Sequence, residues 1–294
     1  MPANIKRDRI ILSHPSGSSA EILLYGATVI SWKSIGPDDS TPSERLFVSG
    51  KAATDGSKPV RGGIPVVYPC FGAPTHPDHM KLPQHGYLRN NVWQFDGIPM
   101  DNEAGVTLRL TMAPNAAMKE QYSYPVRLQY VVTLAPHQLS TDLHVKNVAS
   151  SDSSPMEFQA LFHNYFRCVA NDALVYPLKG LSYLDKTEAT PELRSSTKLE
   201  LRDGVDVKKF TDSVYLDGPK RYTLRWPGGE IDINTNLNDV VVWNPQQEAG
   251  SKIGDMEDGG WDKYVCVEPG TVRGFITLPP GENYICRQTL TVKV

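Results

Sequence analysis

The chain has 294 residues, 40% of them hydrophobic, which is enough for one large β domain or two smaller domains. Its 30 basic and 33 acidic residues give a formal net charge of −3, which argues against the broad positive field that nonspecific nucleic-acid binding requires. A small anionic ligand such as a phosphometabolite remains compatible with this charge, because a few local arginines are enough to hold one phosphate.

The start of the chain carries no pattern typical of secretion or membrane insertion. Met1–Ile11 mixes charged and isolated apolar residues, and no apolar segment typical of a signal peptide follows it. The longest apolar candidate, Ile22–Trp32, is interrupted by polar residues and is far shorter than the roughly 20 residues of a spanning helix. The four cysteines are widely separated without a CxxC pair, which favours reduced thiols over zinc ligands or disulfides. We therefore expect a soluble, cytoplasmic protein.

Alternating apolar and polar residues predict β-strands through the middle and the end of the chain. The segments with this pattern are, in chain order, 106–112, 128–134, 139–148, 222–226, 231–233 and 284–294. Between two of them, Pro227–Gly229 is typical of a hairpin turn. Two other segments, 115–121 and 191–199, predict only a helical turn or two each, because neither sustains an apolar stripe.

These elements together predict an all-β protein. The 23 prolines and 23 glycines are spread along the chain, and no stretch is typical of an interdomain linker, so we expect one domain over residues 1–294. Many antiparallel strands must stack as two sheets or close into a barrel to bury their apolar faces. A large antiparallel β-sandwich with few short helices is the simpler of these arrangements.

Two segments in the first third of the chain place polar groups in unusual settings. Arg61 lies in the Gly/Pro-rich, otherwise apolar stretch 59–69, where its charge needs an anion or carbonyl groups as partners. Gln84, His85 and Arg89 bring an amide, an imidazole and a guanidinium into one loop-like run that suits hydroxyls and phosphate. Structural roles fit both segments as well, as an arginine bound to loop carbonyls and as a solvated loop.

Three histidines suggest different kinds of chemistry. His76 and His79 are spaced like metal ligands, but their proline-broken loop lacks the third and fourth ligands, so we predict no metal site. His163 is surrounded by apolar and aromatic residues, where burial favours the neutral imidazole that exchanges protons near pH 7. A core histidine bound to one backbone carbonyl would fit the same pattern.

Two acidic residues lie beside predicted strands in the last third of the chain. Asp212 stands between a loop and a strand, where it either orients an imidazole, binds sugar hydroxyls or caps a turn. Glu268 ends an apolar strand directly before a Pro-Gly pair, and a half-buried carboxylate at such a place is suited to act as a base. A surface glutamate beside a turn is the alternative. Trp243 also follows an apolar strand. Stacking on a sugar face is one role for it, but a tryptophan at such a place usually belongs to the core or an interface, so we assign it there and leave it out of the predicted site.

Five of these motifs, taken in order, resemble those of the glucose-6-phosphate 1-epimerases, a branch of the aldose 1-epimerase (galactose mutarotase) family. The motifs are Arg61–Pro65, Gln84–Gly86 with Arg89, Phe162–Phe166, Asp212–Tyr215 and Val267–Gly270. The resemblance runs over most of the chain, roughly from Ala20 onward, and five motifs in sequence are much harder to explain by chance than one. It implies a galactose mutarotase-like β-sandwich with a sugar cleft on the concave face of one sheet, in a cytoplasmic enzyme.

The resemblance also assigns roles to residues. It implies that His163 and Glu268 are the acid and the base. The substrate contacts that it implies are Arg61, Gln84, His85, Arg89 and Asp212. Among these, the two arginines are the candidates for the 6-phosphate, because guanidinium groups match phosphate oxygens.

The implied chemistry agrees with these residue types. Opening a pyranose requires one group to remove the proton of the anomeric hydroxyl and another to protonate the ring oxygen, so we expect the two to face each other across the sugar. Glu268 would take the proton and His163 would give one. Rotation about C1–C2 followed by reclosure yields the other anomer. No metal, redox or other cofactor is needed.

Two other classes of function remain open from the residues. A noncatalytic carbohydrate-binding sandwich would need aromatic and hydrogen-bonding groups but no paired acid and base. A glycoside hydrolase would use Asp212 and Glu268 as its two carboxylates, which leaves His163 and both arginines without a role. We expect a hexose 6-phosphate as the substrate and neither nucleic acid nor membrane as a partner. The oligomeric state stays open, and a monomer fits the sequence.

Overall fold

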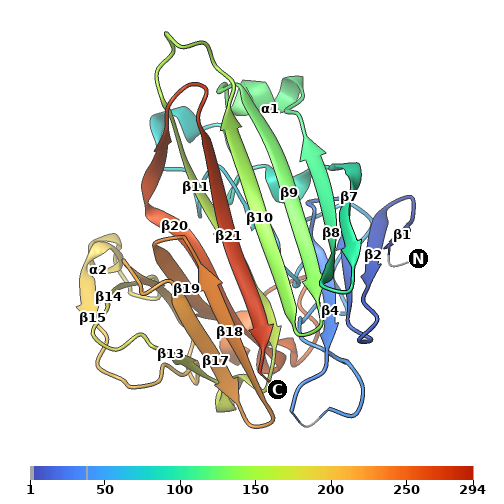
Figure 1. Ribbon diagram of the computed structural model, residues 1–294. Helices are drawn as coiled ribbons and strands as arrows, with labels where there is room; N and C mark the ends of the chain where they lie inside the picture. Colours follow the sequence, from blue (N-terminus) through green and yellow to red (C-terminus); the bar gives the residue numbers. More distant parts are fainter. Residues whose placement is uncertain (1–2, 38, 294) are drawn as a thin grey trace.

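The computed structural model describes residues 3–37 and 39–293, where antiparallel β-sheet is the main regular structure (Figure 1). The strands form three sheets. The first sheet follows the order of the chain and consists of β1 Ala3–Ile5, β2 Arg9–Ser13, β3 Ser19–Leu23, β4 Val29–Ser34 and β5 Ser43–Glu44.

The two larger sheets combine strands from distant parts of the chain. The second sheet contains, in spatial order, β13 Leu174–Tyr176, β17 Arg221–Trp226, β18 Gly229–Thr235, β21 Asn283–Val292, β10 Gln138–Asn147, β9 Val126–Ala135, β8 Gly105–Met112 and β7 Gln94–Asn102. The third sheet contains β15 Thr197–Leu199, β14 Ser182–Asp185, β16 Thr211–Tyr215, β19 Asp239–Asn244, β20 Tyr264–Leu278, β11 Met156–Phe162 and β6 Val66–Val67, with β12 Tyr165–Arg167 also paired to β20.

Short helices connect these strands. The α-helices are α1 Ala116–Gln121, α2 Pro191–Ser195 and α3 Gln246–Gly250, and the 3-10 helices are η1 Pro77–His79, η2 Leu88–Asn90, η3 Ala170–Asp172 and η4 Gly260–Lys263. Asn115 and Thr190 begin α1 and α2 by accepting backbone N–H hydrogen bonds on their side-chain oxygens. Within the described residues, no helix is long and apolar enough to cross a membrane.

The strand predictions are confirmed. Each of the six alternating segments corresponds to a strand, although Val294 at the end of the last one lies outside the described residues. Trp226 pairs with Gly229 across a two-residue turn, so the predicted hairpin is also confirmed. The predicted helical segment 191–199 is helical only as far as Ser195, because residues 197–199 pair with β14 instead. The protein is therefore all-β, as predicted.

The main apolar core includes inward-facing residues of all three sheets. In β20, Val265 and Val267 belong to this core, so the alternation of a strand turns Cys266 and Glu268 toward the opposite face of the third sheet. The same alternation in β16 buries Tyr215 in the core and turns Asp212 to that opposite face. The third sheet thus has an apolar face and a second face that carries polar groups.

Candidate active site

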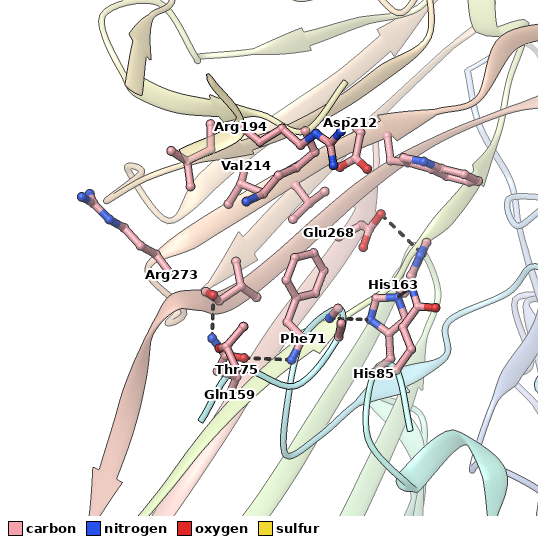
Figure 2. Close-up of a pocket in the computed structure, with 18 of the residues that line it drawn as sticks. Phe71, Thr75, His85, Gln159, His163, Arg194, Asp212, Val214, Glu268 and Arg273 are labelled. Atoms are coloured by element: carbon pink, nitrogen blue, oxygen red, sulfur yellow. Dashed lines mark hydrogen bonds and ion pairs between the residues drawn. The ribbon is translucent and has the colours of Figure 1, made fainter. Parts of the chain in front are cut away.

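A cleft of about 670 Å³ lies on this second face of the third sheet (Figure 2). Strands β11, β16, β19 and β20 supply its floor, and the loops around Phe71 and His85 supply one wall. The cleft contains six of the seven predicted site residues: Arg61, Gln84, His85, His163, Asp212 and Glu268. Arg89 is not part of the lining. It lies behind the loop, where its Nη2 donates to the carbonyl oxygen of Gln84 at 3.0 Å.

The segment after β11 holds His163 beside Glu268. The backbone N–H of His163 donates to Pro65 O at 3.0 Å, next to the pairing of β11 with β6. Asn164 is fully buried, and its Nδ2 donates to Val267 O at 2.9 Å, one residue before Glu268. This amide fastens the histidine segment to β20. The first motif of the sequence, around Arg61–Pro65, therefore lies next to the end of β11 and the His163 segment, because β6 pairs with β11.

The two proposed proton-transfer groups are in direct contact. His163 Nδ1 lies 3.4 Å from Glu268 Oε1, and Figure 2 shows the two side chains directed toward each other. Glu268 is 1% exposed, and both its Oε2 and His163 Nδ1 are buried without a hydrogen-bond partner among the described residues. We expected His163 and Glu268 to face each other across the sugar, but the two side chains lie side by side. This arrangement still suits the reaction, because the anomeric hydroxyl oxygen and the ring oxygen are bonded to the same carbon atom.

Burial dominates the protonation of this pair. Desolvation, followed by the nearby carboxyl of Asp212, holds the pKa of Glu268 well above its usual value. Desolvation, followed by the charges of His85, Arg89 and Arg61, holds the pKa of His163 well below its usual value. The neutral imidazole predicted for His163 is thus favoured, and the carboxyl beside it favours its protonated form.

Asp212 lies on the same face as Glu268, two strands along the sheet, with β19 between their strands. It pairs in register with Trp243 of β19, which in turn pairs with Cys266 of β20. Burial raises the pKa of Asp212 to about 6, with opposing contributions from Lys186, which lowers it, and Asp185, which raises it. The second carboxyl of the cleft is therefore poised to change its charge near neutral pH.

His85 is held as a hydrogen-bond donor to the cleft. Its ring Nδ1 accepts from the backbone N–H of Gly72 at 3.2 Å, so the neutral ring carries its proton on Nε2. Burial, then the charges of Arg89 and Arg61, lowers the pKa of His85 to about 3, which keeps the ring neutral. Its ring centroid lies 6.1 Å from that of His163. A neutral Nε2–H near the ring of His163 is suited to donate to an oxygen atom of a bound ligand.

Two arginines surround the histidine end of the cleft. Arg61 Nε donates to Asp255 at 2.9 Å and its Nη1 donates to the hydroxyl of Tyr165 at 3.2 Å. The Arg89 Nε is buried without a partner among the described residues. Both positive charges contribute to the lowered pKa of His163.

Sequence reasoning missed several residues of the cleft. Trp243, which we assigned to the core or an interface, lines the cleft, and its ring centroid lies 6.0 Å from that of His163. Gln159 is also in the lining, and its amide connects Phe71 N at 2.9 Å with Val272 O at 2.6 Å. The one sequence feature that could have indicated the position of Trp243 is strand alternation. Trp243 is two residues after Val241, so the two side chains project from the same face of the strand.

Cations also gather on the far side of the cleft, where the sequence carried no recognisable motif. These lining residues are Lys186, Arg194 and Arg273. The Arg194 guanidinium donates to the carbonyls of Glu188 at 2.6 Å and Ala189 at 3.0 Å, which fixes its position beside the start of α2. Figure 2 shows Arg194 beside Asp212 at the upper wall.

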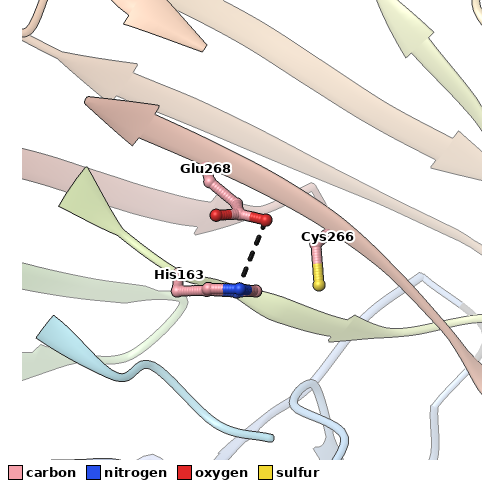
Figure 3. Close-up of side chains that lie close together, drawn as sticks. All are labelled: His163, Cys266 and Glu268. Carbon is pink, nitrogen blue, oxygen red and sulfur yellow. Dashed lines mark ion pairs between the residues drawn. The ribbon is translucent and has the colours of Figure 1, made fainter. Parts of the chain in front are cut away.

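Two groups of side chains bear on metal binding. His76 Nε2 lies 3.1 Å from Glu157 Oε2, and His79 Nε2 lies 3.0 Å from the carbonyl oxygen of Glu157. Among the residues that the structure describes, these histidines are not part of a group of three metal-binding side chains. In the described part of the chain, the cluster with suitable donors is instead His163, Cys266 and Glu268, whose ligand atoms all lie within 4.8 Å of one another (Figure 3).

Comparison with known proteins shows the family to which this chain belongs. Residues 8–291 match the family model described as aldose 1-epimerase. A Cenchrus ciliaris protein named "Putative glucose-6-phosphate 1-epimerase" is 29% identical over 293 residues, which cover 97% of this chain and 84% of that protein. A protein of the same name from Salmonella typhimurium is 28% identical over 269 residues, covering 89% of this chain and 82% of its own length.

Solved structures show the same fold. The structure of "a putative mutarotase (YeaD) from Salmonella typhimurium" has a TM-score of 0.83 at 22% identity and covers 99% of this chain and 92% of that chain. The Slr1438 protein from Synechocystis sp. PCC 6803 has a TM-score of 0.78 at 18% identity, with coverage of 100% and 98%. The predicted galactose mutarotase-like β-sandwich is confirmed. Since the family model spans almost the whole chain, the protein belongs to the aldose 1-epimerase family of sugar epimerases.

Proposed function

We propose that this protein interconverts the α and β anomers of a hexose 6-phosphate, with glucose 6-phosphate as the first candidate, by acid/base ring opening and reclosure. The contact of His163 with Glu268 in a buried cleft is the observation that carries this proposal. The names of the two curated relatives support the choice of sugar phosphate. Because only protons move during the reaction, the proposal involves no cofactor.

One proton shared by the pair accounts for both directions of the reaction. The raised pKa of Glu268 and the lowered pKa of His163 favour a protonated carboxyl beside a neutral imidazole. Transfer of that proton across the 3.4 Å contact gives a carboxylate and an imidazolium, the forms in which each group begins ring opening. The transfer changes neither the number of protons nor the total charge of the buried site.

The cycle then balances at each step. The Glu268 carboxylate removes the proton of the anomeric hydroxyl while the His163 imidazolium protonates the ring oxygen, the C1–O5 bond breaks and the aldehyde forms. Rotation about C1–C2 presents the other face of the carbonyl. Reclosure reverses both transfers: the C5 hydroxyl gives its proton back to His163 and Glu268 protonates the new anomeric oxygen. The pair leaves the cycle in the state in which it entered.

The remaining predicted residues bind the substrate in this proposal. Arg61, which lines the cleft, holds the 6-phosphate, and Arg89, bound to the Gln84 carbonyl behind the loop, adds its positive charge to that end of the cleft. His85 donates its Nε2–H to a sugar oxygen, Gln84 contributes its amide and Asp212 accepts a sugar hydroxyl. Arg61 is already bound to Asp255, so a phosphate there adds to an existing ion pair rather than meeting a free guanidinium.

We also propose that the protein acts in the cytoplasm as one domain over residues 1–294. All four cysteines are free and buried, which supports a reducing compartment. The family model covers residues 8–291, which supports one unit. With a net charge of −3, we propose a small sugar phosphate as its partner, without nucleic acid or membrane.

The reaction is tested by NMR magnetisation transfer between the α and β anomers of glucose 6-phosphate, at matched buffer and enzyme concentrations. We expect wild type to accelerate the exchange and His163→Ala and Glu268→Ala each to reduce kcat/KM by about 10²-fold or more, since each removes one proton-transfer group. Circular dichroism and urea unfolding confirm that the variants remain folded. Sugar-phosphate binding without acceleration by wild type would contradict the epimerase and favour the noncatalytic binding sandwich.

The same experiment with free glucose tests the phosphate assignment. Arg61→Gln and Arg89→Gln should weaken exchange of glucose 6-phosphate about tenfold or more while changing glucose exchange little, because only the phosphate loses a charged partner. Equal losses with both sugars would contradict the assignment. Release of an alcohol from glycosides, measured in parallel, separates the hydrolase alternative from the epimerase.

A further inference from the structure

Three different metal-binding donors meet at the floor of the cleft. The Nδ1 of His163, the Sγ of Cys266 and a carboxylate oxygen of Glu268 all lie within 4.8 Å of one another (Figure 3). Cys266 and Glu268 are two residues apart on β20 and therefore project from the same face of the strand, while the Asn164 amide holds His163 against them. The strand pairing, rather than a sequence motif, brings the three groups together.

The donors are available for a ligand. His163 Nδ1 and Glu268 Oε2 are buried and have no hydrogen-bond partner among the described residues. Glu268 is 1% exposed and Cys266 is fully buried, so neither water nor distant side chains compete strongly for them. Unpartnered polar atoms at such depth are rare in folded proteins.

We propose that His163, Cys266 and Glu268 form a binding site for a thiophilic divalent cation such as Zn²⁺ or Cd²⁺, and that the bound ion inhibits the enzyme by occupying its acid–base pair. Imidazole and thiolate donors select zinc-like ions, whereas Mg²⁺ and Ca²⁺ prefer sets made only of oxygen atoms. The ion binds as the Cys266 thiol and the Glu268 carboxyl each give a proton to solvent. It is an inhibitor here, because it blocks the atoms that the reaction needs.

The geometry is close to that of a three-ligand zinc site. Zn–N and Zn–O bonds of about 2.0–2.1 Å give a tetrahedral edge of about 3.3 Å. The observed separation of His163 Nδ1 from Glu268 Oε1 is 3.4 Å, so this edge already has the required length. An edge to sulfur, with a Zn–S bond of about 2.3 Å, is about 3.5 Å, so Sγ, which lies within 4.8 Å of the other two donors, needs to approach by at most about 1.3 Å.

The cleft provides access and the fourth position. His163 and Glu268 line it, whereas Cys266 lies beneath them against Tyr165 and Tyr264. An ion that enters from the cleft meets the imidazole and carboxylate first and the thiol last. Its fourth position then faces the space where the sugar would bind, so metal and sugar exclude each other.

Direct metal binding tests the site without any measure of catalysis. Cd²⁺ is titrated into the reduced protein, and the ultraviolet charge-transfer absorption of a cadmium–thiolate bond is followed. We expect one equivalent to bind wild type, and Cys266→Ala to lose the absorption and weaken the affinity by at least about tenfold. The control Cys286→Ala removes another fully buried thiol, one in the main core, and should bind Cd²⁺ like wild type.

Two further variants test the individual ligands. Cys266→Ser replaces the thiol with a group of similar size, so it tests the ligand if the alanine variant is poorly folded. His163→Ala should also weaken Cd²⁺ binding while the thiolate absorption persists. Wild-type affinity in both Cys266 variants, or an equal loss in Cys286→Ala, would overturn the proposal.

Inhibition is measured separately, with the anomer-exchange rate of each protein compared with its own metal-free rate. Micromolar Zn²⁺ should slow wild type and Cys286→Ala, Mg²⁺ should slow neither, and Cys266→Ala should need at least about tenfold more Zn²⁺. Excess glucose 6-phosphate should raise the apparent Kd for Cd²⁺. A protein that binds Cd²⁺ through Cys266 but has no exchange activity would contradict the proposed function and leave the metal site standing.

Discussion

The buried carboxyl of Asp212 makes the stability of the folded protein depend on pH. In the folded protein burial raises its pKa to about 6, whereas in the unfolded chain it titrates near its usual value of 3.8. The folded state therefore binds more protons than the unfolded state between these values, and the free energy of unfolding falls as the pH rises from about 4 to 6. Above that window the carboxylate is a buried charge that disfavours the folded state.

Asp212→Asn is expected to remove this penalty. Two pKa units correspond to about 2–3 kcal/mol, so the variant should gain about 2 kcal/mol of unfolding free energy at pH 8 and little at pH 4. Its anomer exchange should fall, since the carboxylate is a substrate contact in our proposal. Urea unfolding at the two pH values measures the first effect. Asp258→Asn, at a side chain that is 99% exposed, is the control and should change little at either pH; equal gains would contradict the burial argument.

Short motifs predicted His163 and Glu268 as site residues, but they did not predict that Trp243 and Cys266 lie beside them. Trp243 follows an apolar strand in the manner of a core residue, and only the pairing of β19 with β16 and β20 shows that its side chain faces the cleft. Cys266 gave no metal signal because only Glu268 is near it in the sequence, while the third donor, His163, lies in a distant segment. Motifs detect groups that are close in sequence, and these contacts are between strands.

Backbone geometry at Gly86 determines the position of the loop that carries His85. Gly86 has φ +72°, and a Cβ there would lie 1.9 Å from the carbonyl oxygen of Tyr68. The same oxygen accepts the backbone N–H of Tyr87 at 3.1 Å. The loop therefore approaches the chain after β6 so closely that a side chain does not fit. A glycine in the second predicted motif is thus a steric requirement of the site wall.

Gly86→Ala should displace this wall. We expect a loss of about 2–4 kcal/mol in unfolding free energy, from the left-handed backbone and the overlap with Tyr68, and at least tenfold slower anomer exchange as His85 moves. Gly228→Ala is the matched control: Gly228 has φ +87° but no atom within 4 Å of the added Cβ. It should lose only about 1 kcal/mol and keep its exchange rate. Similar activity losses in both variants would contradict a specific role for the loop.

Strand prediction succeeded where a strand has one apolar and one polar face. Strands β8, β9 and β10 alternate over 8 to 10 residues and were recognised. Strands of two or three residues, such as β5 and β6, carry too few positions for a period to be visible. Strand β6 nevertheless matters, because its pairing with β11 brings the Arg61 segment beside His163.

A buried amide pair connects the two large sheets through the middle of the molecule. Asn164 and Gln288 are fully buried, and each side-chain amide donates to the other at 2.8 Å. Asn164 lies between β11 and β12 of the third sheet, and Gln288 lies in β21 of the second. The hydrogen bonds thus tie the segment carrying His163 to the opposite sheet across the core.

Gln288→Met should break this connection with little change in side-chain volume. The Asn164 oxygen then remains buried without a donor, so we expect a loss of about 2–3 kcal/mol in unfolding free energy, measured by urea denaturation. Gln138 donates to Thr291 at 3.3 Å in a half-buried position of the same sheet, and Gln138→Met should lose less than about 0.5 kcal/mol. If both variants lost the same unfolding free energy, the Asn164–Gln288 hydrogen bonds would contribute no more to stability than a half-buried hydrogen bond.

The local pattern of residues was sufficient for the all-β class, the longer strands and the Pro227–Gly229 turn, because alternation and turn chemistry depend on neighbours in the chain. The five motifs pointed to the family and its sugar chemistry. The prediction of a single domain stays a prediction.

The tertiary structure alone placed His163 in contact with Glu268, added Trp243 to the cleft and set Arg89 behind it. Those distances follow from which strands pair and in which register, and the pKa values of the cleft follow from burial by neighbours far apart in sequence. No short stretch of the chain contains that information, because the neighbours of each group come from several strands of the third sheet and from the loops beside it.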